Sequence, residues 1–372
     1  MSKTKIPLKI QNLLWAQSGG RCEYDGCNRI LYRDLLTKID CNSAYIAHIV
    51  ADSADGPRGD IVRSPLLAKD IKNLMLLCDT HHRLIDKEQV EEHPESLLLK
   101  MKTKHDERIE KLTGIVSDKN STIIWYGANI GDQSAVVSYR VACKTIVPEY
   151  YPAYNYAIEL GLKNSGFQER DKLYWEVEEQ NLTKQFKEKI SNALEQHFSL
   201  FALAPQPLLV KLGTLFSDMY SVDVYQKHRE PDTWEWQDLQ NGNIDNPFIL
   251  NTPSEYKGKV VLILALSAPI TERIKQFYIK EKTSVWEITI EKPQLDFLQY
   301  SKQLVYFRNI VREVFKDIKQ KCPNKEIYVH MAMPNACAVE FGRGWMHKVD
   351  ADLVLYDTYN DKENEAIIIK HS

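Results

Sequence analysis

The sequence contains no long apolar segment. Its longest uniform apolar run, residues 260–266, is far shorter than the roughly 20 residues that span a bilayer. The opening residues, MSKTKIPLKI, include lysines but no apolar stretch of the length found in signal peptides. We therefore expect a cytoplasmic protein without a membrane partner.

An excess of positive charge is also missing. The 48 Lys and Arg residues are outnumbered by 51 Asp and Glu residues, which gives a net charge of −3. Affinity for nucleic acid comes largely from Lys and Arg that neutralise phosphates, so this balance argues against a constitutively tight nucleic-acid binder. A chain of this composition that acts on DNA must concentrate its positive charge locally or assemble several copies.

The length of 372 residues predicts more than one domain, because about 150 residues is typical of a single one. We expect an N-terminal unit over residues 1–115, a polar linker over residues 116–122 and a second unit over residues 123–372. In the second unit strand-like and helix-like segments alternate, which predicts an α/β fold with a mostly parallel, Rossmann-like sheet. Strands are expected at residues 123–126, 135–141, 208–212, 222–226, 260–266, 285–290, 327–331 and 351–355, and helices at residues 91–111, 182–203 and 304–318.

A weak internal repeat accompanies this alternation. Residues 208–226, and residues 327–342 together with 352–357, both suggest an apolar strand, small residues, a helix and a second strand. Two α/β halves of similar build would explain the likeness, and chance similarity is the alternative.

The cysteines do not suggest a disulfide framework. Four of the seven lie in the first 80 residues and the others are scattered, a placement more typical of metal binding in a cytosolic chain. Cys22-x4-Cys27 and Cys78-x2-His81 form two short-spaced pairs, which can supply the four tetrahedral ligands that structural Zn²⁺ requires. Ordinary cysteines beside a surface histidine are the alternative interpretation.

The two pairs bracket a second signature, formed by His48, Asn73 and His82. These residues lie within AYIAHIVADSADGPRGD and NLMLLCDTHHRLID, which resemble the HNH endonuclease family over about residues 20–90. The resemblance implies a zinc-stabilised ββα-metal domain that hydrolyses phosphodiester bonds of double-stranded DNA.

The resemblance also implies a role for each residue. His48 matches the general base, for which an imidazole is suited by its ordinary pKa of about 6.5. Asn73 matches the residue that holds the His48 region in place, and His82 matches a ligand of the catalytic divalent ion, expected to be Mg²⁺. Asp86 would lie on the same helical face as His82, either as its partner or as a plain solvated carboxylate.

Two features leave this assignment open. The position before the base, where many family members carry a metal ligand, is Ala47. Because Mg²⁺ keeps several waters, activity does not require a ligand there. His81 and His82 are adjacent and their roles could be exchanged, although Cys78-x2-His81 has the better spacing for zinc.

The rest of the chain resembles the SAVED domain, the cyclic-oligonucleotide receptor of CBASS anti-phage systems. The residues that carry this resemblance are VDVYQKHREPDTWEW (222–236) and HMAMPNACAVEFGRGW (330–345), together with the N-terminal HNH-like unit. It implies two fused CARF-like α/β units, a cyclic di- or trinucleotide activator and an anti-phage effector that acts by abortive infection. Because each chain neutralises few phosphates, we also expect homo-oligomer formation on activation.

Open α/β sheets bind ligands beyond the carboxyl ends of their strands, which here indicates the loops at residues 266–269 and 333–336. Helix N-termini in such loops favour phosphate, a neighbouring arginine would neutralise it, and an aromatic ring would stack on a base. A buried core role is the alternative for the tryptophans. The expected ligand-binding residues are Ser267, Pro334, Asn335, Arg343 and Trp345.

Two other functions remain possible from sequence. A modification-dependent HNH restriction endonuclease would read DNA with its C-terminal half and should carry a basic face there. A zinc-stabilised nucleic-acid-binding module without catalysis would need neither His48 nor Asn73.

Overall fold

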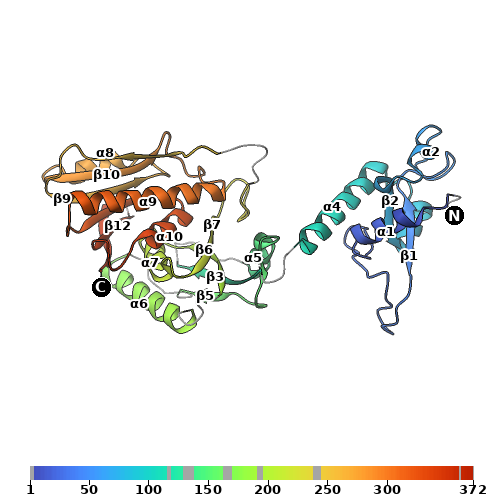
Figure 1. Cartoon of the computed structure of the whole chain (residues 1–372), viewed down its shortest axis with the longest axis horizontal. Coiled ribbons are helices and arrows are strands. Elements are labelled where there is room, and N and C mark those ends of the chain that lie inside the picture. Colours follow the sequence, from blue (N-terminus) through green and yellow to red (C-terminus); the bar gives the residue numbers. More distant parts are fainter. Residues whose placement is uncertain are drawn as a thin grey trace. The chain divides into compact units, whose positions relative to one another are not determined.

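The computed structural model describes residues 4–114, 119–128, 138–161, 170–190, 196–237, 244–359 and 362–371. The chain divides into two compact units, Met1–Val116 and Ser117–Ser372, whose elements are labelled in Figure 1. Among the described residues, no helix is both long enough and apolar enough to cross a membrane.

The N-terminal unit is built around an antiparallel pair of strands, β1 (Ala44–His48) and β2 (Leu74–Cys78). All five residues of β2, LMLLC, are buried, because helix α1 (Leu8–Gln17) packs on this strand. Directly after β2 the chain enters α3 (Asp79–Arg83) and a single π-helical turn, η2 (Leu84–Glu88). The remaining helices are α2 (Arg63–Leu67), η1 (Ile71–Asn73) and α4 (Glu95–Thr113).

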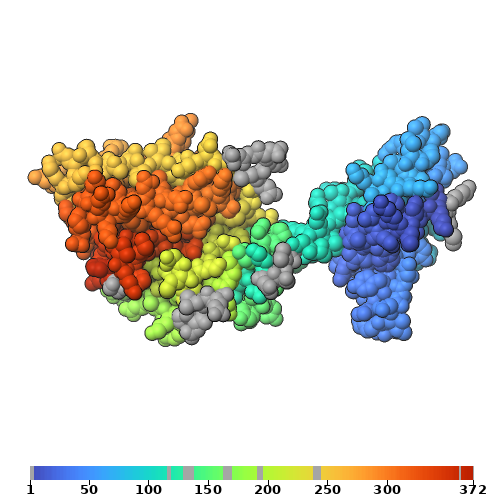
Figure 2. All heavy atoms as spheres, in the orientation of Figure 1, coloured from blue at the N-terminus to red at the C-terminus, as the bar shows by residue number. Residues whose placement is uncertain are grey.

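A tongue formed by residues 31–43 extends from the body of this unit (Figure 2). Its two sides are joined by backbone hydrogen bonds from Cys41 to Tyr32 and from Ser43 to Leu31. Leu36 at its tip is 89% exposed.

The second unit contains two sheets. The first has the order β4-β3-β6-β7, with β5 also paired to β3, and every pair in it is parallel. Its elements are β3 (Asn120–Gly127), α5 (Tyr139–Ile146), β4 (Tyr151–Pro152), β5 (Ile158–Leu160), α6 (Lys172–Lys189), β6 (His197–Leu203), α7 (Gln206–Phe216) and β7 (Ser221–Tyr225).

The second sheet has the order β13-β12-β11-β9-β10-β8. Its four central strands are parallel and the two edge strands are antiparallel, as the alternation in the sequence predicts. Its elements are β8 (Phe248–Asn251), β9 (Lys259–Ala265), α8 (Thr271–Phe277), β10 (Thr283–Ile290), α9 (Ser301–Lys321), β11 (Ile327–Ala332), α10 (Asn335–Gly344), β12 (Leu353–Tyr359) and β13 (Lys362–Ile369).

The two sheets share one core, at whose centre helices α7 and α10 pack against each other. The helices touch through Gly213 and Gly342, where an added Cβ would collide with the carbonyl oxygens of Val339 and Val210 respectively. Each helix follows a strand and a proline, and each glycine comes eight residues after its proline, Pro205 or Pro334. The internal repeat therefore relates β6-α7-β7 to β11-α10-β12.

The expected repeat began with a strand at residues 208–212. In the structure these residues belong to helix α7, so the repeat begins one element earlier, at strand β6. A short apolar run does not distinguish a buried strand from a buried helix, and α7 is buried on most of its surface. The expected helix at residues 182–203 is also wrong in part: α6 ends at Lys189, and residues 197–203 form β6.

Two further expectations differ from the structure. Of the expected strand at residues 135–141, residues 135–137 lie outside the described residues and residues 139–141 begin helix α5. The expected linker over residues 116–122 is too long at its C-terminal end, since β3 begins at Asn120 and buries Ser121 and Thr122 beside β6. Residues 116–118 of that linker lie outside the described part of the chain.

Candidate functional site

The structure brings together the four residues whose spacing suggests a zinc site. One ligand atom from each of Cys22, Cys27, Cys78 and His81 lies within 4.8 Å of the others. The Nδ1 atom of His81 is 3.2 Å from the Cys78 sulfur and 3.6 Å from the Cys22 sulfur. Three thiols and one imidazole converging in this way match the donor set and the compactness of a tetrahedral Zn²⁺ site.

The imidazole of His81 is held in place from outside this cluster. The Tyr24 ring stacks on it at 4.1 Å with an interplanar angle of 5°. The Tyr24 hydroxyl in turn lies 3.0 Å from Nε2 of His93. His81 therefore faces the sulfurs, and the neighbouring His82 is left for another role.

His48 is the last residue of β1, and the residue is 6% exposed. Its Nε2 lies 2.9 Å from the carbonyl oxygen of Ala68. Because a carbonyl only accepts, Nε2 carries the hydrogen and Nδ1 of the neutral ring keeps its lone pair. Nδ1 makes no hydrogen bond with the residues that the structure describes, so the ring is in the tautomer that a general base needs.

Asn73 connects the segment after His48 to the start of β2. Its Oδ1 accepts from the Val50 N–H at 2.8 Å, and its Nδ2 donates to the Val50 carbonyl at 2.9 Å and to the Leu67 carbonyl at 3.2 Å. The backbone of Asn73 also accepts from the Ile49 N–H. This geometry matches the positioning role expected of Asn73.

His82 and Asp86 face each other one helical turn apart, with Nε2 of His82 3.4 Å from Oδ2 of Asp86. Burial lowers the pKa of His82, which favours the neutral, metal-binding imidazole. Tyr45 stacks on this ring at 4.9 Å. An imidazole nitrogen and a carboxylate oxygen fit a divalent ion that keeps several waters, while the buried methyl group of Ala47 adds no ligand.

Asp86 is not a plain solvated aspartate, because its Oδ1 is 2.7 Å from a guanidinium nitrogen of Arg58. Arg58 is a site residue that our sequence analysis missed. The available signal was its place in the Gly-Pro-Arg loop, which entered only as part of the family resemblance.

In the second unit, Ser267, Pro334 and Asn335 lie where parallel strands end. The N–H groups of Leu266 and Ser267 both donate to the Ala332 carbonyl, which joins the end of β9 to the end of β11. Pro334 then caps the start of α10, and Asn335 is its first residue. The strand-end loops at residues 266–269 and 333–336 are therefore adjacent.

The loop between β6 and α7, which follows a strand of the first sheet, contacts these strand-end loops of the second sheet. Nε2 of Gln206, the first residue of α7, donates to the Met333 carbonyl at 3.0 Å, and Gln226 accepts from the Ala336 N–H at 3.0 Å. Oε1 of Gln206 is buried and has no hydrogen-bond partner in the described structure. Neither glutamine was expected from sequence: Gln206 begins a helix that reads as a strand at residues 208–212, and Gln226 ended an expected strand.

The placement of Arg343 and Trp345 contradicts the ligand contacts expected of them. A ten-residue helix is about 15 Å long, and both residues lie at the opposite end of α10 from Pro334. Arg343 donates to the carbonyls of Ser217, Tyr220 and Val222 and pairs with Glu340. Trp345 is 5% exposed and donates its indole N–H to the Ala351 carbonyl. These side chains stabilise the fold.

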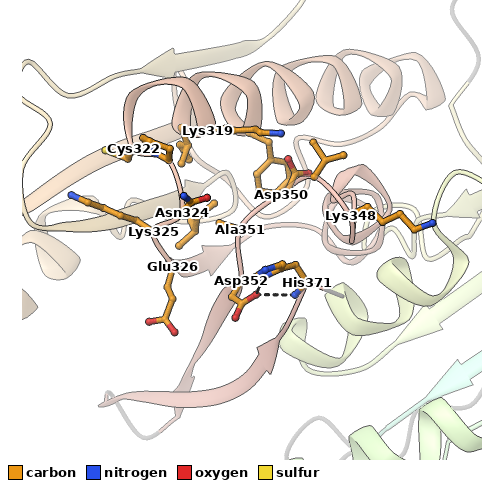
Figure 3. A pocket seen from close by; sticks show the side chains of 15 residues that line it. Lys319, Cys322, Asn324, Lys325, Glu326, Lys348, Asp350, Ala351, Asp352 and His371 are labelled. Carbon is orange, nitrogen blue, oxygen red and sulfur yellow. Dashed lines mark hydrogen bonds and ion pairs between the residues drawn. The ribbon is translucent and has the colours of Figure 1, made fainter.

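A pocket of about 440 Å³ lies beside the starts of β11 and β12, at the opposite ends of these strands from the strand-end loops, and Figure 3 shows the side chains that line it. Several charged groups that line it are already bound within the protein. Asp352 pairs with His371 at 2.5 Å, and Lys325 donates to the Gly258 carbonyl at 3.0 Å. Lys325 and Lys348 point away from each other in Figure 3, so they form no cluster of positive charge for a phosphate.

Comparison with known proteins finds a family match within the second unit. A family model described as SAVED, "SMODS-associated and fused to various effectors sensor domain", matches residues 179–367. No curated protein matches the chain.

Solved structures that match the chain include Cap4 SAVED/CARF-domain receptors. The Acinetobacter baumannii receptor with the cyclic trinucleotide 2'3'3'-cAAA is 10% identical with a TM-score of 0.43, over 73% of this chain and 55% of that one. The same receptor with 3'3'3'-cAAA is 11% identical with a TM-score of 0.42, over 74% and 59%. The Moraxella osloensis receptor is 13% identical with a TM-score of 0.37, over 74% and 58%. This chain thus spans less than two thirds of each of these solved chains.

Proposed function

The chain belongs to the SAVED family, and from this membership and the N-terminal geometry we propose a cyclic-oligonucleotide-activated, metal-dependent endonuclease. Its substrate is double-stranded DNA, and its biological role is that of an anti-phage effector. The observation that carries the nuclease assignment is the tautomer of His48, whose Nε2 is engaged by Ala68 while Nδ1 keeps its lone pair.

His48 acts on the attacking water. Nδ1 accepts a proton from the water, which turns the ring into an imidazolium. The Ala68 carbonyl keeps the ring oriented and stabilises that charge through the hydrogen bond at Nε2. General-base assistance of this kind is worth about 10²- to 10⁴-fold in rate. Asn73 contributes indirectly, because it fixes the backbone just after His48.

His82 and Asp86 hold the divalent ion, for which Mg²⁺ is the natural choice among ions that accept few protein ligands. When bound, this ion supplies positive charge beside the scissile phosphate and the departing oxygen. The Cys22, Cys27, Cys78 and His81 cluster holds a separate structural Zn²⁺, which fastens the loop before the tongue to the turn between β2 and α3.

The strand-end loops of the second unit bind a cyclic di- or trinucleotide. The N-termini of α7 and α10 open at these loops, and backbone N–H groups at helix starts favour phosphate. The carboxamides of Gln206 and Asn335 lie at these loops, where each donates to a backbone carbonyl, and Ser267 follows the end of β9. The unpartnered oxygen of Gln206 supports a ligand contact at this position.

Activation proceeds through self-association of the chain. With a net charge of −3, a single copy neutralises few DNA phosphates and holds DNA weakly. A ligand that prefers the self-associating conformation shifts the population toward it. Several nuclease units on one duplex then act together through their effective concentration.

The test is a DNA-degradation assay with Mg²⁺ and a panel of cyclic di- and trinucleotides. We expect plasmid cleavage only with a matching cyclic nucleotide, and none with EDTA. Cleavage that needs modified DNA and ignores every cyclic nucleotide would favour a modification-dependent restriction enzyme. DNA binding without cleavage under all conditions would favour the non-catalytic module.

A further inference from the structure

Arg58 is turned into the N-terminal unit by an unusual backbone conformation. It lies in the segment Gly56-Pro57-Arg58-Gly59 and has a φ of 55°, in the left-handed region that few side-chain-bearing residues adopt. Gly59 leaves no room for a Cβ, because that atom would collide with the Ala54 carbonyl. The Arg58 side chain is 8% exposed. Such a local cost persists only where the surrounding contacts outweigh it.

Those contacts join the two halves of the candidate nuclease centre. Nε of Arg58 donates to the carbonyl of Ile49, the residue after His48, at 2.6 Å. One terminal nitrogen donates to the Ile85 carbonyl at 2.8 Å, and the other to Oδ1 of Asp86 at 2.7 Å. One side chain therefore links the strand that carries His48 to the helical turn that carries Asp86.

We propose that Arg58 is a positioning residue for the divalent-metal pair His82 and Asp86. This inference rests on the proposed function, since it concerns the same centre. By occupying Oδ1 of Asp86, Arg58 leaves Oδ2 facing His82 at 3.4 Å, so that both ligand atoms point to one place. The same guanidinium holds the Ile49 carbonyl and so couples the position of the base to that of the metal pair.

Arginine suits this task and lysine does not. The planar guanidinium presents its donors in a fixed fork, so it can hold two carbonyls and a carboxylate at once. An ammonium keeps the charge but has no rigid fork, and it cannot reproduce this set of directions. Arg58→Lys therefore separates geometry from charge.

The experiment measures metal binding directly, with Mn²⁺ in place of Mg²⁺, by the electron paramagnetic resonance signal of free Mn²⁺. The full chain is compared with Arg58→Lys, Arg58→Gln and His82→Ala, and circular dichroism gives the folded fraction of each. The control is Arg63→Lys, because Arg63 forms a comparable two-armed pair with Glu95 that does not touch Asp86. Plasmid cleavage is measured in parallel against Mg²⁺ concentration.

We expect one Mn²⁺ per chain that His82→Ala abolishes. Loss of a residue that orients a metal ligand typically costs about 10- to 100-fold in affinity, which we expect for Arg58→Lys and Arg58→Gln but not for Arg63→Lys. The Mg²⁺ concentration that gives half-maximal cleavage should rise by a similar factor. Because Arg58→Gln keeps a donor for the Ile49 carbonyl, it gives a second reading if Arg58→Lys does not fold.

Wild-type Mn²⁺ affinity in folded Arg58 variants would overturn the inference. So would a loss that only follows the unfolded fraction, which indicates a purely structural role. If the wild-type chain has no Mn²⁺ site sensitive to His82→Ala, both this inference and the proposed metal pair fail. If Mn²⁺ binding changes as expected but no cyclic nucleotide induces cleavage, Arg58 keeps its role and the proposed nuclease function fails.

Discussion

Asn73 offers a sharp test of how the N-terminal unit is held together. Asn73 is 5% exposed, and its carboxamide makes hydrogen bonds to both the N–H and the C=O of Val50, which is fully buried. In Asn73→Ala, the N–H and C=O of Val50 lose this partner inside the protein. Each buried group left unsatisfied costs about 1–3 kcal/mol, so the change should destabilise this region by about 2–6 kcal/mol.

A cost of this size is large against the stability of a small domain, which is about 5–15 kcal/mol. Since every 1.4 kcal/mol is a factor of ten, backbone amides of β2 should exchange with deuterium at least about 30-fold faster in Asn73→Ala than in the wild type. Amides of β9 in the second unit serve as the control and should be unchanged. Hydrogen exchange followed by mass spectrometry measures both in the full chain.

Asn73→Asp keeps the shape of the side chain and reverses one hydrogen-bonding role. One carboxylate oxygen still accepts from the Val50 N–H, but the other faces the carbonyls of Val50 and Leu67. Burial and these carbonyls should raise the pKa of the introduced carboxyl above its ordinary value of about 3.9. The ionised form then destabilises the fold at neutral pH, and stability returns as pH falls through the raised pKa.

The reasoning is refuted if Asn73→Ala leaves exchange in β2 within a factor of two of the wild type. It is also refuted if Asn73→Asp loses stability, relative to the wild type, as pH falls from 7 toward 5. Either result would mean that the Val50 backbone finds other partners and that Asn73 does not hold the segment after His48.

The remaining predictions concern catalysis, metal content and gating. His48→Ala should lower cleavage by about 10²- to 10⁴-fold while the chain stays folded and still binds its ligand, and an unchanged rate would remove His48 as the base. Cys78→Ser should unfold the N-terminal unit, because a small domain depends on its structural metal. Elemental analysis of the wild type should find one zinc per chain, and a zinc-free preparation with full thermal stability would contradict this. The activating cyclic nucleotide should raise both the particle mass measured by light scattering and the rate of cleavage. Ser267→Leu or Asn335→Ala should reduce the increase in mass and the increase in cleavage. Cleavage that switches on at constant mass would indicate a rearrangement within one chain and not assembly.

Parts of the fold could be predicted from sequence because they depend on local pattern. The apolar run at residues 260–266, the alternation at residues 285–290 and the helical spacing at residues 304–318 correspond to β9, β10 and α9. The same reasoning failed at residues 208–212, because a helix buried on most sides reads like a buried strand. The displaced repeat follows from this one error.

For the sites, sequence alone determined which chemistry was available. The Cys and His spacings and the positions of His48, Asn73 and His82 were readable because each pair or motif lies within a short segment. Only the tertiary structure decided how these segments meet: that Ala68 selects the tautomer of His48, that Arg58 joins Ile49 to Asp86, and that Arg343 binds backbone carbonyls. Hydrogen-bond partners far apart in the chain leave no periodic pattern in it, because they depend on where the backbone folds and not on which residue comes next.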